Sequence, residues 1–145
     1  MHNCQRAFQS VLERRLQPFG VTPSHWYHLN ELWSEDGLTQ VELSGRLAIE
    51  KASSTRILED LAARGLIERR RLTDDRRKIA NCLTPKGRKL TARLIDETVA
   101  LTAQSQRGLA ADDMRVFLKV LGTLTTNLRG MAGQSDGSRP SAPSS

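Results

Sequence analysis

Apolar residues recur three and four positions apart along most of the chain, which is the pattern of amphipathic helices. The first such stripe lies in residues 5–19 and consists of Phe8, Val11, Leu12, Leu16 and Phe19. A second helix is predicted to begin at Thr22-Pro23, because a threonine hydroxyl caps exposed amides and proline has a helical φ. It carries Trp26, Leu29, Leu32 and Trp33 and ends near Asp36-Gly37.

Two shorter helices follow, separated by a brief turn. Thr39 and Glu42 have the spacing of a capping box, in which each side chain bonds the other residue's amide, so a short helix should begin there. The next helix is predicted to begin near Lys51 or Ala52, with Ile57, Leu58 and Leu61 on its inner face. Gly65 is expected to end it in the left-handed conformation.

The pattern changes at Leu66 to that of a charged β-hairpin. Residues 66–72 and 78–83 are predicted strands, and residues 73–75 the turn between them. Thr84-Pro85 then starts a long helix, and a last helix starts near Asp112 with an apolar stripe of Phe117, Leu121, Leu124 and Leu128. Residues 131–145 are rich in Gly, Ser, Pro and Ala, and are expected to be a disordered tail.

This order of elements predicts a mainly α fold with a small β-hairpin wing. Residues 39–83 have the arrangement of a winged helix-turn-helix, flanked by further helices at both ends of the chain. We expect a single domain over residues 1–130, a length typical of one globular domain.

Composition narrows the class of protein. The formal net charge is +6 and the isoelectric point about 10.0, which favours an anionic partner such as nucleic acid. Cys4 and Cys82 lie far apart, which indicates neither a disulfide framework nor a metal site. No leader peptide or membrane-length apolar run is recognised, so we expect a cytoplasmic protein. Because no nucleophile motif, phosphate loop or ligand cluster is found, we expect no enzyme, no cofactor and no metal.

The beginning of the second helix of the predicted helix-turn-helix carries the first set of candidate DNA-binding residues. In this motif the second helix enters the major groove. Short hydroxyls there can donate to phosphate or base edges, and an arginine can bind guanine in bidentate fashion. The candidates are Lys51, Ser53, Ser54, Thr55 and Arg56. The alternative is that the hydroxyls only cap the helix and Arg56 is a solvated surface charge.

The hairpin carries the second set. Arginines occupy positions 69–71, and more cations follow the turn, so the strands would repel one another unless phosphates or carboxylates lie between them. The candidates for DNA contact are Arg70, Asp75, Arg76, Arg77 and Lys78. A solvated run of charge is the alternative interpretation.

Several of these segments resemble the multiple antibiotic resistance regulator (MarR) family. They are Leu38-Thr39-Gln40 with Glu42-Leu43, Leu61 with Gly65-Leu66-Ile67, Arg69-Arg70, Asp75-Arg76-Arg77, and Leu83-Thr84-Pro85-Lys86-Gly87. The resemblance covers roughly residues 5–130, and the run from Gly65 to Gly87 is its most specific part.

The resemblance implies a homodimer on double-stranded DNA with a pseudo-palindromic operator, in which residues 5–20 and 84–130 form the dimerisation helices. It implies that Arg77 enters the minor groove while Asp75 orients the wing, and that Lys51, Ser53 and Thr55 face the major groove. Family members are mostly repressors released by small phenolic or anionic effectors or by cysteine oxidation. This chain departs from the pattern in a short N-terminal arm, and neither cysteine matches the family's sensing cysteine.

An effector would be expected beside the helix that carries Trp26, His28 and Trp33, which are the candidate ligand-binding residues. Aromatic residues at helical spacing are also typical of a core, and His28 can be a structural histidine. The alternative function is a winged-helix module that binds another protein and no DNA, which the basic helix and wing disfavour.

Overall fold

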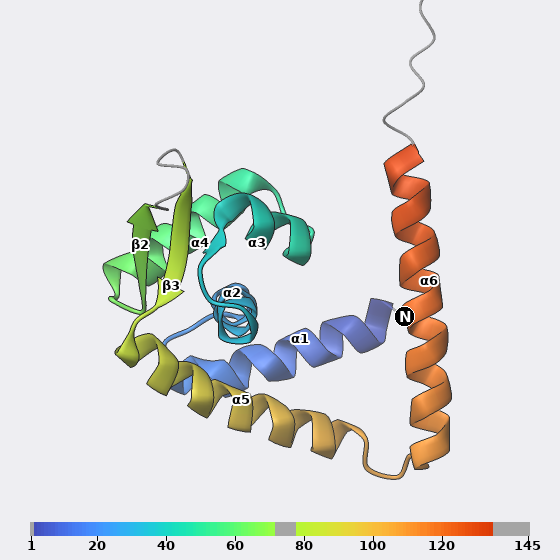
Figure 1. Cartoon of the computed structure of the whole chain (residues 1–145). Helices are drawn as coiled ribbons and strands as arrows, with labels where there is room; N and C mark the ends of the chain where they lie inside the picture. The colour runs from blue at the N-terminus through green and yellow to red at the C-terminus, as the bar shows by residue number, and fades with distance from the viewer. Residues whose placement is uncertain (1, 72–77, 135–145) are drawn as a thin grey trace, which may run out of the picture. The chain divides into compact units, whose positions relative to one another are not determined.

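A computed structural model of the chain describes residues 2–71 and 78–134. The chain divides into two compact units, Met1–Ser105 and Gln106–Ser145. The elements of the first unit are α1 (His2–Leu16), η1 (Gln17–Phe19), α2 (Pro23–Ser34), β1 (Leu38–Thr39), α3 (Gln40–Leu47), α4 (Lys51–Ala63), β2 (Ile67–Arg71), β3 (Ile79–Leu83) and α5 (Pro85–Ser105). The second unit contains α6 (Ala111–Gln134) (Figure 1). The predicted fold class, mainly helical with a small β wing, is confirmed.

The predicted helix starts are found at their caps. The Thr22 hydroxyl accepts a hydrogen bond from the His25 amide at 3.3 Å, with Pro23 in the first turn of α2. In the Thr39 capping box, the Glu42 carboxylate accepts from the Thr39 amide at 2.7 Å, and the Thr39 hydroxyl accepts from the Glu42 amide at 3.3 Å. Gly65 follows α4 with a φ of +68°, as its position in the sequence indicates.

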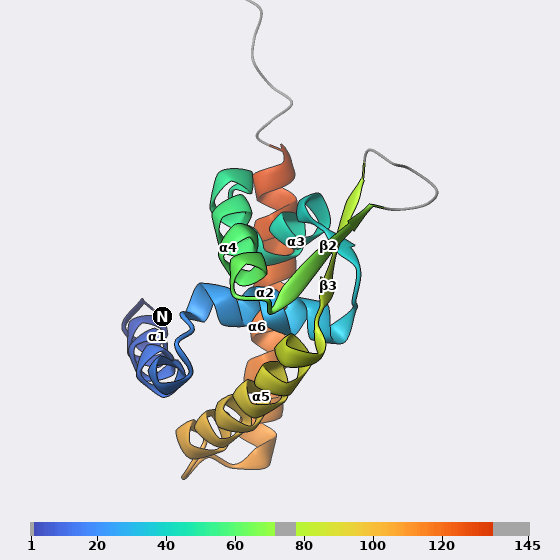
Figure 2. The same cartoon turned by 90° about the vertical axis from the view of Figure 1, so that its left-hand side faces the viewer.

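The sheet has one strand more than the sequence predicted. Its order is β1-β3-β2, all antiparallel, with Ile67 opposite Leu83 and Leu38 opposite Asn81. The two-residue strand β1 is too short to show a periodicity, and it is held in part by the Asn81 amide, which donates to the Leu38 carbonyl at 2.9 Å. The strands β2 and β3 lie side by side next to α4, and α5 leads away from the base of the sheet (Figure 2).

The core of the first unit is built mainly from leucines, which α1, α2, α3, α4 and α5 all contribute. Most residues predicted to face inward are buried, and the fully enclosed ones are Leu12, Leu16, Leu29, Leu32, Leu43, Leu58, Leu61 and Leu94. Phe8 and Trp33 are instead exposed, because they lie at the free ends of the stripes of α1 and α2. Within the described residues, no helix has both the length and the hydropathy needed to cross a bilayer.

The second unit presents an apolar helix face. Helix α6 has Asp112 and Asp113 in its first turn, as predicted from the preference of acids for helix N-termini. Four residues spaced three or four apart are exposed on one face: Phe117, Val120, Leu124 and Leu128. The helix extends to Gln134, past the predicted boundary at 130, and residues 135–145 of the predicted tail lie outside the described residues.

The base of the wing meets the start of α5 in a very close approach. The Thr84 amide donates to the Leu66 carbonyl at 3.1 Å, and the Thr84 hydroxyl donates to the Gly65 carbonyl at 2.7 Å. A Cβ atom added to Gly87 would lie 1.9 Å from the Leu66 carbonyl oxygen. Only glycine fits there, because any side chain would push α5 away from the backbone that begins β2.

Gly87→Ala should therefore destabilise the protein by about 1–3 kcal/mol or more, since the clash is with backbone rather than with a side chain that can rotate away. Denaturant unfolding followed by circular dichroism measures this. The matched control is Gly45→Ala on α3, where no atom lies within 4 Å and the added methyl should stabilise by about 0.5–1 kcal/mol. Equal stability of Gly87→Ala and the wild type would show that the close approach is not rigid.

Candidate nucleic-acid interface

Helices α3 and α4 form the helix-turn-helix. The turn between them passes through Ala48, whose φ of +52° is left-handed. The Gln40 side chain at the start of α3 donates to the Lys51 carbonyl at 3.0 Å and also bonds the Thr55 hydroxyl. These bonds tie the first turns of the two helices together. The sequence named Gln40 only within the segment that resembles the MarR family and did not predict its contact with α4.

One face of α4 is open to solvent. Its exposed residues are Lys51, Ala52, Ser53, Arg56, Glu59 and Ala63, while the opposite face is buried in the core. Three of the five candidates predicted on this helix, Lys51, Ser53 and Arg56, therefore lie where a duplex can reach them. They combine two cations with a hydroxyl that can donate or accept.

Two of the five candidates on α4 point elsewhere. Ser54 is 0 % exposed and its hydroxyl lies 3.1 Å from Nε2 of His28, so its assignment to DNA contact is corrected. Thr55 is half-buried, and its hydroxyl donates to the Lys51 carbonyl at 2.8 Å and bonds Gln40. The four consecutive candidates, residues 53–56, cannot share one face, because successive side chains are turned by about 100°.

The wing presents its arginines on both faces of β2. Arg70 pairs with Glu68 on one face. The strand alternation places Arg69 and Arg71 on the other, which is the face of buried Ile67. All three arginines and Lys78 are exposed. Periodicity alone would have turned Arg69 and Arg71 toward the buried side with Ile67, and it is their exposure in the structure that adds them to the candidates. The predicted contacts Asp75, Arg76 and Arg77 lie outside the described residues.

His28 is a structural residue of the core. It is 1 % exposed, Nδ1 lies 2.8 Å from the Ser24 carbonyl oxygen, and Nε2 faces the Ser54 hydroxyl. Because a carbonyl can only accept, Nδ1 carries the proton and Nε2 accepts from Ser54. Burial lowers the pKa of His28, which favours this neutral form. Neither ring nitrogen is available to an effector, so the ligand-binding assignment of His28 is corrected.

His25 makes a second link from α2 to α4. Its Nδ1 accepts from the Thr22 amide at 3.1 Å, and Nε2 lies 2.9 Å from Oδ2 of Asp60. Arg64 Nε lies 2.8 Å from the same oxygen. Burial, and then the charge of Arg64, lower the pKa of His25 more than Asp60 raises it. The ring is therefore neutral with its proton on Nε2, the opposite tautomer to that of His28.

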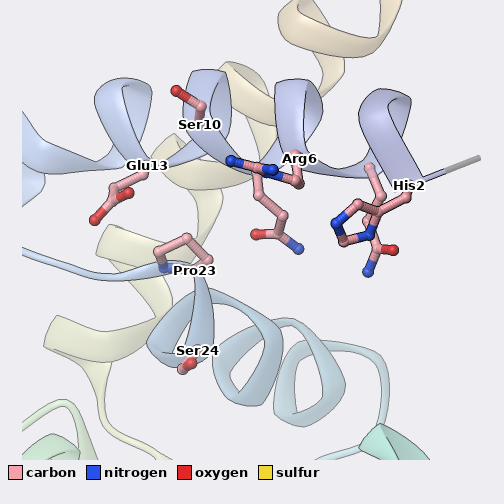
Figure 3. A pocket seen from close by; sticks show the side chains of 8 residues that line it. His2, Arg6, Ser10, Glu13, Pro23 and Ser24 are labelled. Carbon is pink, nitrogen blue, oxygen red and sulfur yellow. The ribbon is translucent and has the colours of Figure 1, made fainter.

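A cavity of about 530 Å³ opens between α1 and the start of α2 (Figure 3). Its lining residues are His2, Gln5, Arg6, Gln9, Ser10, Glu13, Pro23 and Ser24. The predicted ligand residues lie elsewhere: Trp26 is buried in the core and Trp33 is exposed. The effector and its site stay a prediction.

The two cysteines differ in environment. Cys4 is exposed on α1, and Cys82 on β3 is half-buried. Burial and the nearby Asp36 raise the pKa of the Cys82 thiol. A raised pKa reduces the reactive thiolate fraction, in agreement with a packing role for Cys82.

Comparison with known proteins points to one family. Residues 19–78 match the model of the MarR family. The transcriptional repressor CouR, crystallised with a 23-mer DNA duplex, is 26% identical over 86% of this chain and 88% of its own, with a TM-score of 0.80. A MarR transcriptional regulator from Methanosarcina mazei is 25% identical over 88% and 91%, with a TM-score of 0.80. A MarR protein from Peptoclostridium difficile is 19% identical over 92% and 88%, and its TM-score of 0.85 shows the shared fold.

The two buried histidines make stability depend on pH. Both have pKa values below the usual 6.5, so the unfolded chain binds protons more readily than the folded one. Their contribution is full above about pH 6.5 and is lost as the pH falls through that value toward their folded pKa values. We expect the free energy of unfolding, from urea titrations at a series of pH values, to fall below pH 6.5. This fall should be smaller in His28→Gln. An identical pH dependence in that variant would contradict the assignment.

Proposed function

Since residues 19–78 match the model of the MarR family and the chain has the fold of its transcription regulators, we propose that the protein binds specific DNA sequences and regulates transcription, most simply as a repressor. The observation that carries this proposal is the exposed cationic surface formed by α4 and β2. It presents Lys51 and Arg56 from the helix and the arginines of the strand without burying any of them.

Helix α4 reads the major groove in this proposal. Arg56 lies in the second turn of the helix on the open face, where a guanidinium can bind O6 and N7 of guanine. Ser53 lies one turn before it and can bond either a base edge or a phosphate. Lys51 at the helix start adds a cation to the partial positive charge of the helix N-terminus, which favours a phosphate.

The wing supplies affinity that is independent of sequence. Arg69, Arg71 and Lys78 are exposed cations of the described strands and their flank, and we propose that Arg76 and Arg77, oriented by Asp75, continue this surface to the minor groove. Each phosphate neutralised releases counterions, so binding should weaken steeply as salt rises.

We further propose a homodimer held by α6. The exposed face of Phe117, Val120, Leu124 and Leu128 is apolar along several turns of one helix. A soluble chain rarely leaves so long a stripe open to water, and a second copy is the simplest cover. Two copies would bring two recognition helices to half-sites about 10 base pairs apart, and hence to a pseudo-palindromic operator.

An effector is a further part of the proposal. A small phenolic or anionic molecule would release the protein if it bound one spacing of the two recognition helices better than another, and only by that difference in affinity. The alternative function, a winged-helix module that binds protein alone, predicts no affinity for duplexes at low salt.

Single substitutions should separate base reading from backbone binding. Arg71→Ala should weaken binding to every duplex and make log Kd less dependent on log salt by about 0.9. Arg56→Ala should instead relax discrimination by about 1–3 kcal/mol at particular base pairs. Fluorescence anisotropy with selected and random duplexes across a salt series measures both. Arg14→Ala on α1 is the control for a lost surface charge. Undiminished affinity in Arg71→Ala would contradict the role given to the wing.

Charge placed on the apolar face of α6 should dissociate the dimer. Phe117→Glu with Leu124→Glu should halve the mass seen in sedimentation and weaken operator binding, because burying two carboxylates costs more than the interface supplies. Thr126→Glu lies on the opposite side of the same helix and should leave the mass unchanged. A wild-type chain that sediments as a monomer, or a charged variant that remains dimeric, rejects this interface.

A further inference from the structure

Helix α2 is attached to the recognition helix α4 through two histidines. His28 bonds Ser54, in the first turn of α4, and His25 contacts Asp60, near its last turn. The other nitrogen of each ring bonds the beginning of α2: Nδ1 of His28 lies 2.8 Å from the Ser24 carbonyl oxygen, and Nδ1 of His25 lies 3.1 Å from the Thr22 amide nitrogen. Each imidazole therefore joins the beginning of α2 to α4, His28 at the first turn of α4 and His25 near its last turn.

The His28–Ser54 bond is closed to water. Both residues are almost completely buried, so neither polar atom can exchange its partner for solvent. Losing the bond would leave a buried nitrogen without a partner, which costs more than the bond itself contributes. The bond is therefore maintained in the folded state and fixes the first turn of α4 against α2.

The His25 contact fixes the other end. Oδ2 of Asp60 lies 2.9 Å from Nε2 of His25 and 2.8 Å from Nε of Arg64, and the Arg64 guanidinium also donates to the Gly20 carbonyl in the turn before α2. The last turn of α4 is thus tied to α2 and to the segment that precedes it. Ser54 and Asp60 are therefore the two anchors of α4, the residues through which it contacts the histidines of α2. They are six positions apart, or about 9 Å along the helix axis.

Two anchors on one helix determine its direction as well as its position. A single bond would allow α4 to pivot about it, whereas a second contact at this separation, between His25 and Asp60, opposes the pivot. The exposed Ser53 and Arg56 lie one and two residues from Ser54, so their positions relative to a base edge follow from its bond to His28. Bidentate base contacts require placement within about 0.5 Å and 10–20°, while phosphate contacts tolerate more.

From this arrangement we propose that His25 and His28 are positioning residues that orient α4 for base recognition, and that this pair determines how well the protein distinguishes its operator from other DNA. The inference rests on the proposed function. Loosening the two anchors leaves the cations of α4 and β2 in place, so binding to random duplexes is retained while discrimination is lost.

The test substitutes the residues of α4 that contact the two histidines. Ser54→Ala deletes the hydroxyl that His28 accepts from, and Asp60→Asn removes the charge that His25 and Arg64 share. The measured quantity is the ratio of Kd for a random duplex to Kd for a duplex selected by the wild type. We expect each variant to lower this ratio about fivefold to tenfold and the double variant to lower it further. Affinity for the random duplex should change less than twofold.

The control is Tyr27→Phe. This change also removes a hydrogen bond of α2, but one that Gln9 of α1 donates at 2.8 Å, and it should leave the ratio unchanged. Circular dichroism establishes that each variant is folded; should Ser54→Ala not fold, Asp60→Asn carries the same test at a partly exposed position. A double variant that is folded and discriminates like the wild type overturns the inference alone. A wild type that selects no sequence overturns the proposed function first.

Discussion

The backbone of Leu66 lies against the backbone of Gly87, and the placement of α4 and the wing depends on this contact. The end of α4, the start of β2 and the first turn of α5 meet there, held by the Thr84 hydroxyl and by the Lys86 ammonium, which donates to the Arg64 carbonyl at 2.8 Å. Because backbone faces backbone, no rotamer can relax the contact. The recognition helix and the wing are therefore fixed to α5 as one body, and an event that moves α5 would move both.

In the first unit the cationic side chains of α4 and β2 are exposed, whereas the two histidines beneath α4 are kept neutral by burial. A protonated imidazole there would place a charge in a buried site and repel nearby cations, and its bond to Ser54 would have to reverse, with Nε2 donating to the hydroxyl. Acidification should therefore affect the bonds beneath α4 before it affects the exposed arginines, since guanidinium groups remain charged throughout.

Helix positions and the winged arrangement were predictable because caps and apolar spacing are local signals. Thr22-Pro23, the Thr39–Glu42 box and Gly65 each marked a boundary that the structure confirms. The sequence did not predict which way individual side chains face or which distant segments pair. Ser54 was grouped with its neighbours although the helix turns it inward, and β1 is defined only by its pairing with β3. The role of Gln40 likewise depends on a contact with residues 11 and 15 positions away.

In the proposed function, two copies of one cationic helix and wing are presented together to duplex DNA. The sharpest test is selection of bound fragments from a random duplex library by the purified full chain. We expect enrichment of an inverted repeat whose half-sites lie about 10 base pairs apart, centre to centre. Recovery of no enriched sequence, or of a single unrepeated half-site, would contradict it.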